Sequence, residues 1–192
     1  MSYRDGAGYL RVAAIAFLFA GSACGSSQGT SDAGDGPAGP GSCSANVPAG
    51  QACNTLTNVG VSVTPTCVSG PIPTGTGGTI VDGTYTLTSQ TYYGTTACPS
   101  EPVNATLEIT SGCVQEVSSS PIPVTASTAH TVSGATITST VTCVDLGVDA
   151  GPLTFDTKTD TFTATPTTFT LFIKNSGTSS PNPDRVETYQ KH

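Results

Sequence analysis

The stretch Thr84-Tyr85-Thr86-Leu87-Thr88 decides the fold, because hydroxyl and apolar side chains alternate in it with a period of two. Successive side chains of a strand point to opposite faces of a sheet, so this alternation predicts a strand with one solvated and one buried face. Threonine suits the solvated face because it is β-branched and ends in a polar atom. The same alternation recurs at 104–109, 136–142, 161–163 and 168–173.

Helices have little room in this chain. All 14 prolines follow residue 23, and the strong helix formers Ala, Leu, Glu and Lys are sparse. We therefore expect an all-β domain over residues 79–192, with about eight short antiparallel strands that form a barrel or a sandwich and so leave few exposed edges. Its expected core is the apolar set that the strands turn to one face: Tyr85, Leu87, Leu107, Ile109, Val132, Ile137, Val141, Phe162, Phe169, Leu171, Ile173 and Val186.

The N-terminus has the three parts of a secretory signal. Arg4 and Arg11 form the basic region, residues 12–20 the apolar region, and Gly21-Ser22-Ala23 the small-residue cleavage site. The apolar run is shorter than the roughly 20 residues that a membrane-spanning helix needs. Residues 1–23 are therefore predicted to be a signal peptide.

Small residues followed at once by Cys24 resemble the lipobox of bacterial lipoproteins, although Gly21 stands where that pattern usually has Leu. The resemblance implies that Cys24 carries a lipid anchor and becomes the N-terminus after cleavage. A plain peptidase site at the same place would instead release a soluble secreted protein. In the lipoprotein family an Asp after the Cys marks inner-membrane retention, so Gly25 and Ser26 favour the outer membrane, with the periplasmic or surface face left open.

Residues 24–42 are predicted to be a disordered tether. After Cys24 this stretch contains only Gly, Ser, Thr, Ala, Pro, Gln and Asp, so it cannot bury enough apolar area to offset the cost of ordering its backbone.

The cysteine count supports a disulfide framework. Of the seven cysteines, Cys24 is assigned to lipid, and an even set of six remains: Cys43, Cys53, Cys67, Cys98, Cys113 and Cys143. An exported chain meets an oxidising compartment, so three disulfides are expected, although six cysteines allow 15 connectivities. Three of them precede the Gly/Thr-rich stretch at 74–79 and three follow it, so at least one bridge must cross. Residues 43–78 are thus expected to be strapped to the β domain.

Two resemblances extend this interpretation. The opening Gly83-Thr84-Tyr85, the strands around Phe162 and Phe169, and the closing Tyr189-Gln190-Lys191 look like the lipocalin-like barrels of exported bacterial lipoproteins. That resemblance places Gly83, Tyr85, Tyr189 and Lys191 near one closing seam. The whole chain also resembles uncharacterised lipoproteins of myxobacteria, through Cys53-Asn54-Thr55-Leu56 and the run at 77–83, which implies no known activity.

Candidate catalytic and metal-binding residues are few. His130 is conceivable as a general base, but we expect a solvent-exposed residue. Paired carboxylates are sought in Glu108 and Glu116 or in Asp145 and Asp149, but the alternation puts Glu108 on the outer face. Four acidic side chains could bind calcium: Asp145, Asp149, Asp156 and Asp160. Their spacing matches no recognised calcium-binding loop, and the surrounding Gly and Pro residues are typical of solvated turns. We therefore expect no enzyme activity, no metal and no cofactor.

Net charge narrows the partners. Without residues 1–23 the chain has 12 acidic and 4 basic residues, so nucleic acid and anionic headgroups should repel it, and membrane contact should run through the lipid. Two functions remain. The first is a lipid-anchored structural or interaction module of the cell envelope, and the second is a lipocalin-like binder of a small apolar ligand. Tyr92-Tyr93 fits either function, or one ring packs in the core and the other caps it.

Overall fold

The computed structural model describes residues 43, 52–95, 98–119, 123–146, 157–175 and 183–192. The predicted signal peptide (1–23), Cys24 and the predicted tether (24–42) lie outside the described residues, as do Asp149 and Asp156. Nine strands are described: β1 (Thr66–Val68), β2 (Gly83–Tyr93), β3 (Asn104–Thr110), β4 (Cys113–Ser119), β5 (Pro123–Ser133), β6 (Thr136–Asp145), β7 (Lys158–Ala164), β8 (Thr168–Ile173) and β9 (Asp184–Lys191).

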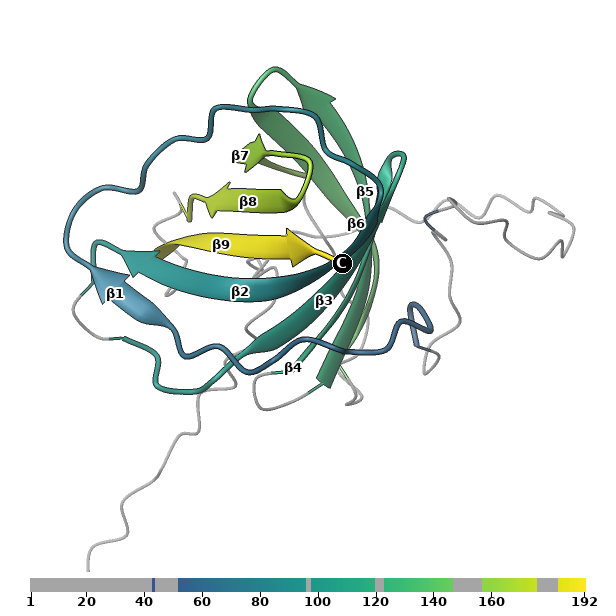
Figure 1. The fold of residues 1–192 in the computed structure, drawn as a ribbon, viewed down its shortest axis with the longest axis horizontal. Helices are drawn as coiled ribbons and strands as arrows, with labels where there is room; N and C mark the ends of the chain where they lie inside the picture. Colours follow the sequence, from purple (N-terminus) through teal and green to yellow (C-terminus); the bar gives the residue numbers. More distant parts are fainter. Residues whose placement is uncertain (1–42, 44–51, 96–97, 120–122, 147–156, 176–182) are drawn as a thin grey trace, which may run out of the picture.

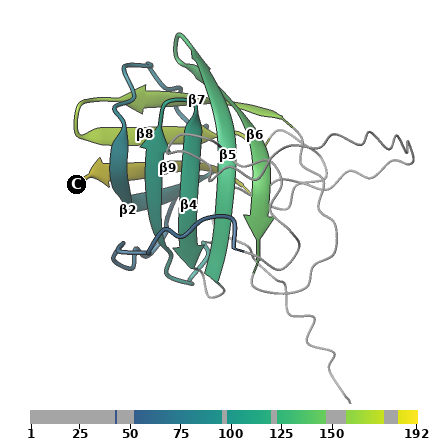
Figure 2. The same cartoon turned by 90° about the vertical axis from the view of Figure 1, so that its right-hand side faces the viewer.

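Strands β2 to β9 form a closed antiparallel barrel (Figures 1 and 2). Each strand pairs with the next along the chain, and β9 returns to pair with β2. The prediction of an all-β antiparallel fold is confirmed, with a barrel rather than a sandwich. The seam also lies where the resemblance placed it, because Tyr85 is opposite Lys191 and Leu87 is opposite Tyr189. Closure gives the eight antiparallel strands hydrogen-bonding partners on both sides and so limits free edges.

The chain before β2 is fastened to the outside of this barrel by three disulfides. They join Cys43 to Cys113, Cys53 to Cys143 and Cys67 to Cys98, with Cα–Cα separations of 5.5 to 5.6 Å. Every bridge therefore connects a residue before the Gly/Thr-rich stretch to one after it. Strand β1 adds to the attachment, since it pairs in parallel with the end of β2.

Between the disulfides, polar side chains hold residues 53–63 against β3, β4 and β5. The Asn54 amide donates to the backbone carbonyls of Glu116 and Ala126, at 3.0 and 2.8 Å. The Thr106 hydroxyl accepts the backbone N–H groups of Val59 and Gly60. This strap explains why Thr106, on the outer face of β3, is fully buried.

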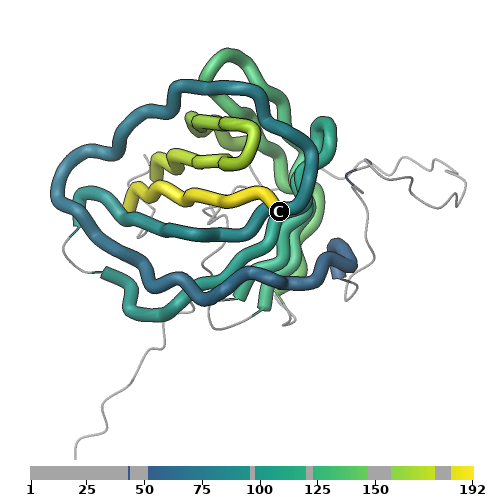
Figure 3. Tube along the Cα trace, in the orientation of Figure 1, coloured from purple at the N-terminus to yellow at the C-terminus, as the bar shows by residue number. Residues whose placement is uncertain are grey.

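Glycines let residues 75–78 lie directly against β7, on the course of the trace that Figure 3 shows between β1 and β2. Gly77 donates to the carbonyl of Phe162 and accepts the N–H of Ala164, which extends the sheet beyond the end of β6. A Cβ on Gly75 would lie 2.3 Å from the Phe162 carbonyl oxygen, closer than any side chain tolerates. The segment then reaches Ile80, which packs on the core, and Val81, whose carbonyl accepts the Tyr85 hydroxyl.

The expected core is largely present, with Val132 as a correction. Val132 is 46% exposed because it lies near the tip of the hairpin between β5 and β6, and β5 is paired with β4 only as far as Ala129. Over the described ranges, no helix is long and apolar enough to cross a membrane.

Candidate functional site: the barrel interior

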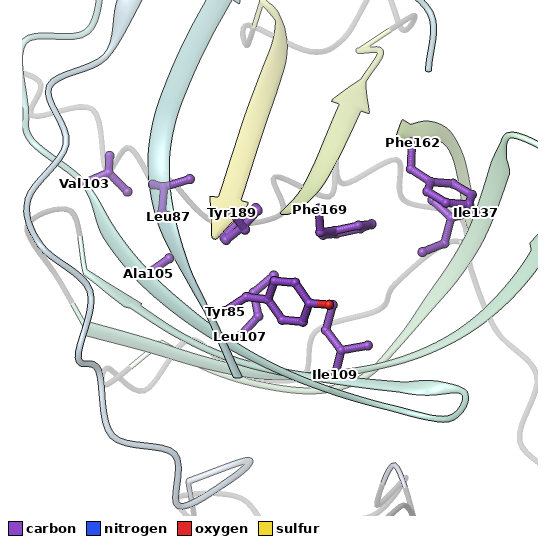
Figure 4. Close-up of a cluster of buried hydrophobic side chains, with 10 residues drawn as sticks. All are labelled: Tyr85, Leu87, Val103, Ala105, Leu107, Ile109, Ile137, Phe162, Phe169 and Tyr189. Carbon is purple, nitrogen blue, oxygen red and sulfur yellow. The ribbon is translucent and has the colours of Figure 1, made fainter. Parts of the chain in front are cut away.

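The barrel interior divides along its axis into two parts, which we call the apolar half and the polar half. The apolar half lies toward residues 75–82 and is filled by aromatic rings and branched side chains (Figure 4). The Phe169 ring contacts those of Tyr85, Phe162 and Tyr189 at centroid separations of 6.2 to 6.4 Å. These rings are buried, and Phe162 exposes no surface, so the chain's own side chains occupy this half.

The polar half begins where β9 turns Glu187 and Arg185 into the barrel. Arg185 is 3% exposed and Glu187 5%, whereas the intervening Val186 is only partly buried. The expectation that Val186 belongs to the inward apolar set is therefore wrong. Inward positions on β9 alternate from Tyr189, so a charged pair occupies the barrel where the hydrophobic pattern predicted valine.

Glu187 is the centre of this polar half. Its Oε1 accepts the Arg185 Nε–H at 2.7 Å and the Gln90 amide at 2.9 Å, while its Oε2 accepts the Tyr189 hydroxyl at 3.0 Å. Burial by itself raises the pKa of Glu187, but Arg185 and these hydrogen bonds outweigh burial and hold the pKa below its usual value. Glu187 is thus an ionised carboxylate inside the barrel.

Glu116 supplies a second buried carboxyl group from β4. Burial, reinforced by the negative charge of Glu187, raises its pKa from 4.5 to about 7. Glu108 points the other way, because Leu107 is the residue opposite Glu116 and Glu108 lies opposite Gln115. The two glutamates therefore lie on opposite faces of the sheet and form no pair, and the expected outer position of Glu108 is correct.

Lys158 and Asp160 on β7 border the cluster. Their side chains are 3.7 Å apart and keep 22% and 10% of their surface exposed. Burial lowers the pKa of Lys158, and burial raises that of Asp160, each against the opposing charge of the other. Both groups interact electrostatically with Arg185 and Glu187, so the interior charges reach solvent on this side.

Two buried polar atoms of this region have no hydrogen-bond partner among the described residues, namely Gln90 Oε1 and Arg185 Nη2. Their residues are at most 3% exposed. A buried donor or acceptor without a partner costs about 1–3 kcal/mol, so native folds leave few of them. Such atoms at the centre of a barrel are the strongest sign of a binding site in the described part of the chain.

Of the residues in and beside this cluster, the sequence had pointed only to Glu116 and Asp160 as site candidates. Alternation would have placed Arg185 and Glu187 on the face of Tyr189, which was the available signal. His130 is half-buried rather than solvent-exposed, because it lies on β5 opposite Ser139; burial lowers its pKa, and Asp82 opposes that shift. Tyr92 is buried and Tyr93 is partly exposed, as expected for a core ring beside a capping one.

The remaining candidates do not come together. Asp160 is committed to Lys158 and to the backbone N–H of Lys174, and Asp145 ends β6. No group of three or more His, Cys, Asp or Glu side chains with the geometry of a metal site occurs within the described ranges. The chain matches no known protein family, and comparison with curated proteins and with solved structures finds no similar protein.

Proposed function

We propose that this protein is an exported, lipid-anchored protein of the cell envelope, in which the barrel is a structural or interaction module. The observation that supports this most is the disulfide from Cys43 to Cys113. Cys43 directly follows the predicted tether, so the first residue after it is bonded to the first residue of β4. A pull on the anchor would be transmitted to the barrel through a covalent bond.

The other two disulfides support the same proposal. Each bridge is worth about 2–4 kcal/mol, chiefly by restricting the unfolded chain. Together they hold the strap on the barrel at Cys53 and Cys67 as well, so the strap cannot peel away from its tethered end. An envelope module that works while attached to a membrane needs this resistance.

The intact mass of the full chain, purified from the membranes of a bacterial host, tests this function. We expect an N-terminus at Cys24 with the mass of three acyl chains, and six further thiols that react only after reduction. The variant Cys24→Ala is the matched control and should leave the membrane fraction. An unlipidated chain that begins at Cys24 would overturn the anchor and leave an odd thiol to account for.

A second candidate function is the binding of a small ligand inside the barrel, and the unpartnered buried atoms of the polar half favour it. The apolar half is already occupied by four aromatic rings. A binder built on this barrel would therefore use the polar half, with the apolar half as its rigid floor. Ligand titration of the folded chain, described below, tests this function separately from the anchor.

A further inference from the structure

We propose that the polar half of the barrel binds a small uncharged molecule that carries a hydrogen-bond donor and an acceptor side by side, such as a carboxamide or a vicinal diol. This inference rests on the second candidate function and names its ligand class. Three observations carry it: the pairing of the unpartnered atoms, the balance of charge, and the width of the barrel.

The unpartnered atoms form a complementary pair. Gln90 and Arg185 each bind the same oxygen, Glu187 Oε1, through one nitrogen. Each also has one buried polar atom without a hydrogen-bond partner among the described residues, the acceptor Oε1 of Gln90 and the donor Nη2 of Arg185. A ligand whose donor and acceptor are adjacent can satisfy both atoms at once, as an amide or a pair of neighbouring hydroxyl groups does.

The charges of the cluster favour a ligand without net charge. Arg185 is paired with Glu187 and Lys158 with Asp160, so the two cations already have partners. An anionic ligand would be brought next to Glu187, Asp160 and Glu116. A cationic ligand would meet Arg185 and Lys158. An anionic ligand would lose its hydration in this buried site without a free cation to pair with, and a cationic ligand would find only Glu116. An uncharged ligand leaves the existing pairs intact.

The width of the barrel limits the size of the ligand. The inward positions of β3, β4 and β5 include the short side chains of Ala105, Ser118 and Ala126, together with Val124 and the longer Glu116. An eight-stranded barrel is just wide enough for side chains to fill, or to hold one small ligand. A barrel of this width therefore limits the ligand to one small molecule. The partly exposed Lys158 and Asp160 mark the side on which the cluster meets solvent.

The test is an NMR titration of the disulfide-bonded full mature chain. The uncharged probes are acetamide, for the amide, and glucose, for the vicinal diol; lactate and ethanolammonium are their anionic and cationic counterparts. We expect saturable shifts of the Gln90 side-chain amide and the Arg185 Nε–H with acetamide or glucose, at concentrations up to about 100 mM. Tighter binding of acetamide would indicate a carboxamide ligand, and tighter binding of glucose a vicinal diol.

A matched pair of variants on β2 locates the site. Gln90→Met removes the inward acceptor and should weaken binding about tenfold, as expected for one lost hydrogen bond in a buried site. Thr88→Val, on the exposed face of the same strand, should leave binding unchanged. If Gln90→Met does not fold, the Arg185 and Gln90 signals of the wild-type chain still decide the outcome. Saturable binding of lactate or ethanolammonium alone at these signals would overturn the ligand class but keep a binder. The absence of any saturable shift would overturn both.

Discussion

The apolar and polar halves of the barrel interior are built by the same strands but are stabilised in different ways. In the apolar half, Phe162 and its neighbouring rings gain free energy simply by leaving water, at about 25 cal/mol per Å² of apolar surface. In the polar half, Arg185 and Glu187 gain their attraction only after losing hydration, and the two effects often cancel. The apolar half therefore supplies most of the stability of the barrel. The buried charges of the polar half add little stability and are better explained by a function.

The largest loss should come from the apolar half. Phe162→Ala removes a ring with no exposed surface and should lower the free energy of unfolding by about 3–5 kcal/mol, measured by denaturant titration. Thr159→Ala, at an exposed position of the same strand, is the control. A loss below about 1.5 kcal/mol for the phenylalanine would mean that this half is loosely packed.

Breaking the charged pair should cost nearly as much, for a different reason. Arg185→Met leaves Glu187 buried without its cation, which should lower the free energy of unfolding by about 3–5 kcal/mol. The double variant Arg185→Met/Glu187→Gln should recover most of that loss, because no unpaired charge remains and the side chain keeps an acceptor for Gln90 or Tyr189. If the double variant is as unstable as the single one, the charged pair itself stabilises the fold and the contrast between the halves is wrong.

The pH dependence of stability should sharpen the contrast further. The unfolded carboxyl of Glu116 ionises near 4.5, while the folded one keeps its proton to about 7. The folded state therefore binds more protons in this window, and the contribution of Glu116 destabilises the fold progressively as pH rises through it, by about 3 kcal/mol in total. Glu116→Gln should abolish this fall in urea titrations from pH 4.5 to 8. Glu108→Gln, on the outer face, is the control; equal slopes in Glu116→Gln and wild type would refute the assignment.

The smallest effects should separate two buried threonines. Thr106→Val removes a hydroxyl that accepts two backbone N–H groups of the strap and donates to Asn58, and should cost about 1–3 kcal/mol. Thr128→Val replaces a hydroxyl without a partner by a methyl group, and should raise the free energy of unfolding by about 1–3 kcal/mol. A large loss at Thr128 in thermal unfolding would indicate that its hydroxyl already has a bound partner, such as a water molecule.

The strands that the sequence predicted are those with threonine on the outer face of the barrel and apolar residues on the inner face. Threonine alternates with apolar residues where one face is wet and the other packs, so β2, β3, β6, β7 and β8 were recognisable as strands. Strand β4 was not, because its sequence Cys-Val-Gln-Glu-Val-Ser-Ser turns Glu116 and Ser118 inward and Val117 outward. A strand with polar residues on its buried face lacks the pattern of apolar inward and polar outward residues by which the other strands were recognised.

The candidate site escaped prediction for the same reason. A charged side chain is almost never fully buried unless it is paired, so Arg185 and Glu187 were natural candidates for the solvated face of β9. Only the seam with β2 brings Gln90 from the other end of the barrel domain to Glu187, 97 positions away. Disulfide pairing was similarly open, because the parity of the cysteines requires one crossing bridge and the fold makes all three cross.

The order of the cysteines along the chain has a consequence for biogenesis. A polypeptide emerges N-terminus first, so Cys43, Cys53 and Cys67 become available before any of their partners, the earliest of which is Cys98. Any disulfide that forms among these first three cysteines is therefore non-native. Because disulfide reshuffling takes seconds to hours without a catalyst, production of this protein should depend on a disulfide isomerase more than on an oxidase alone.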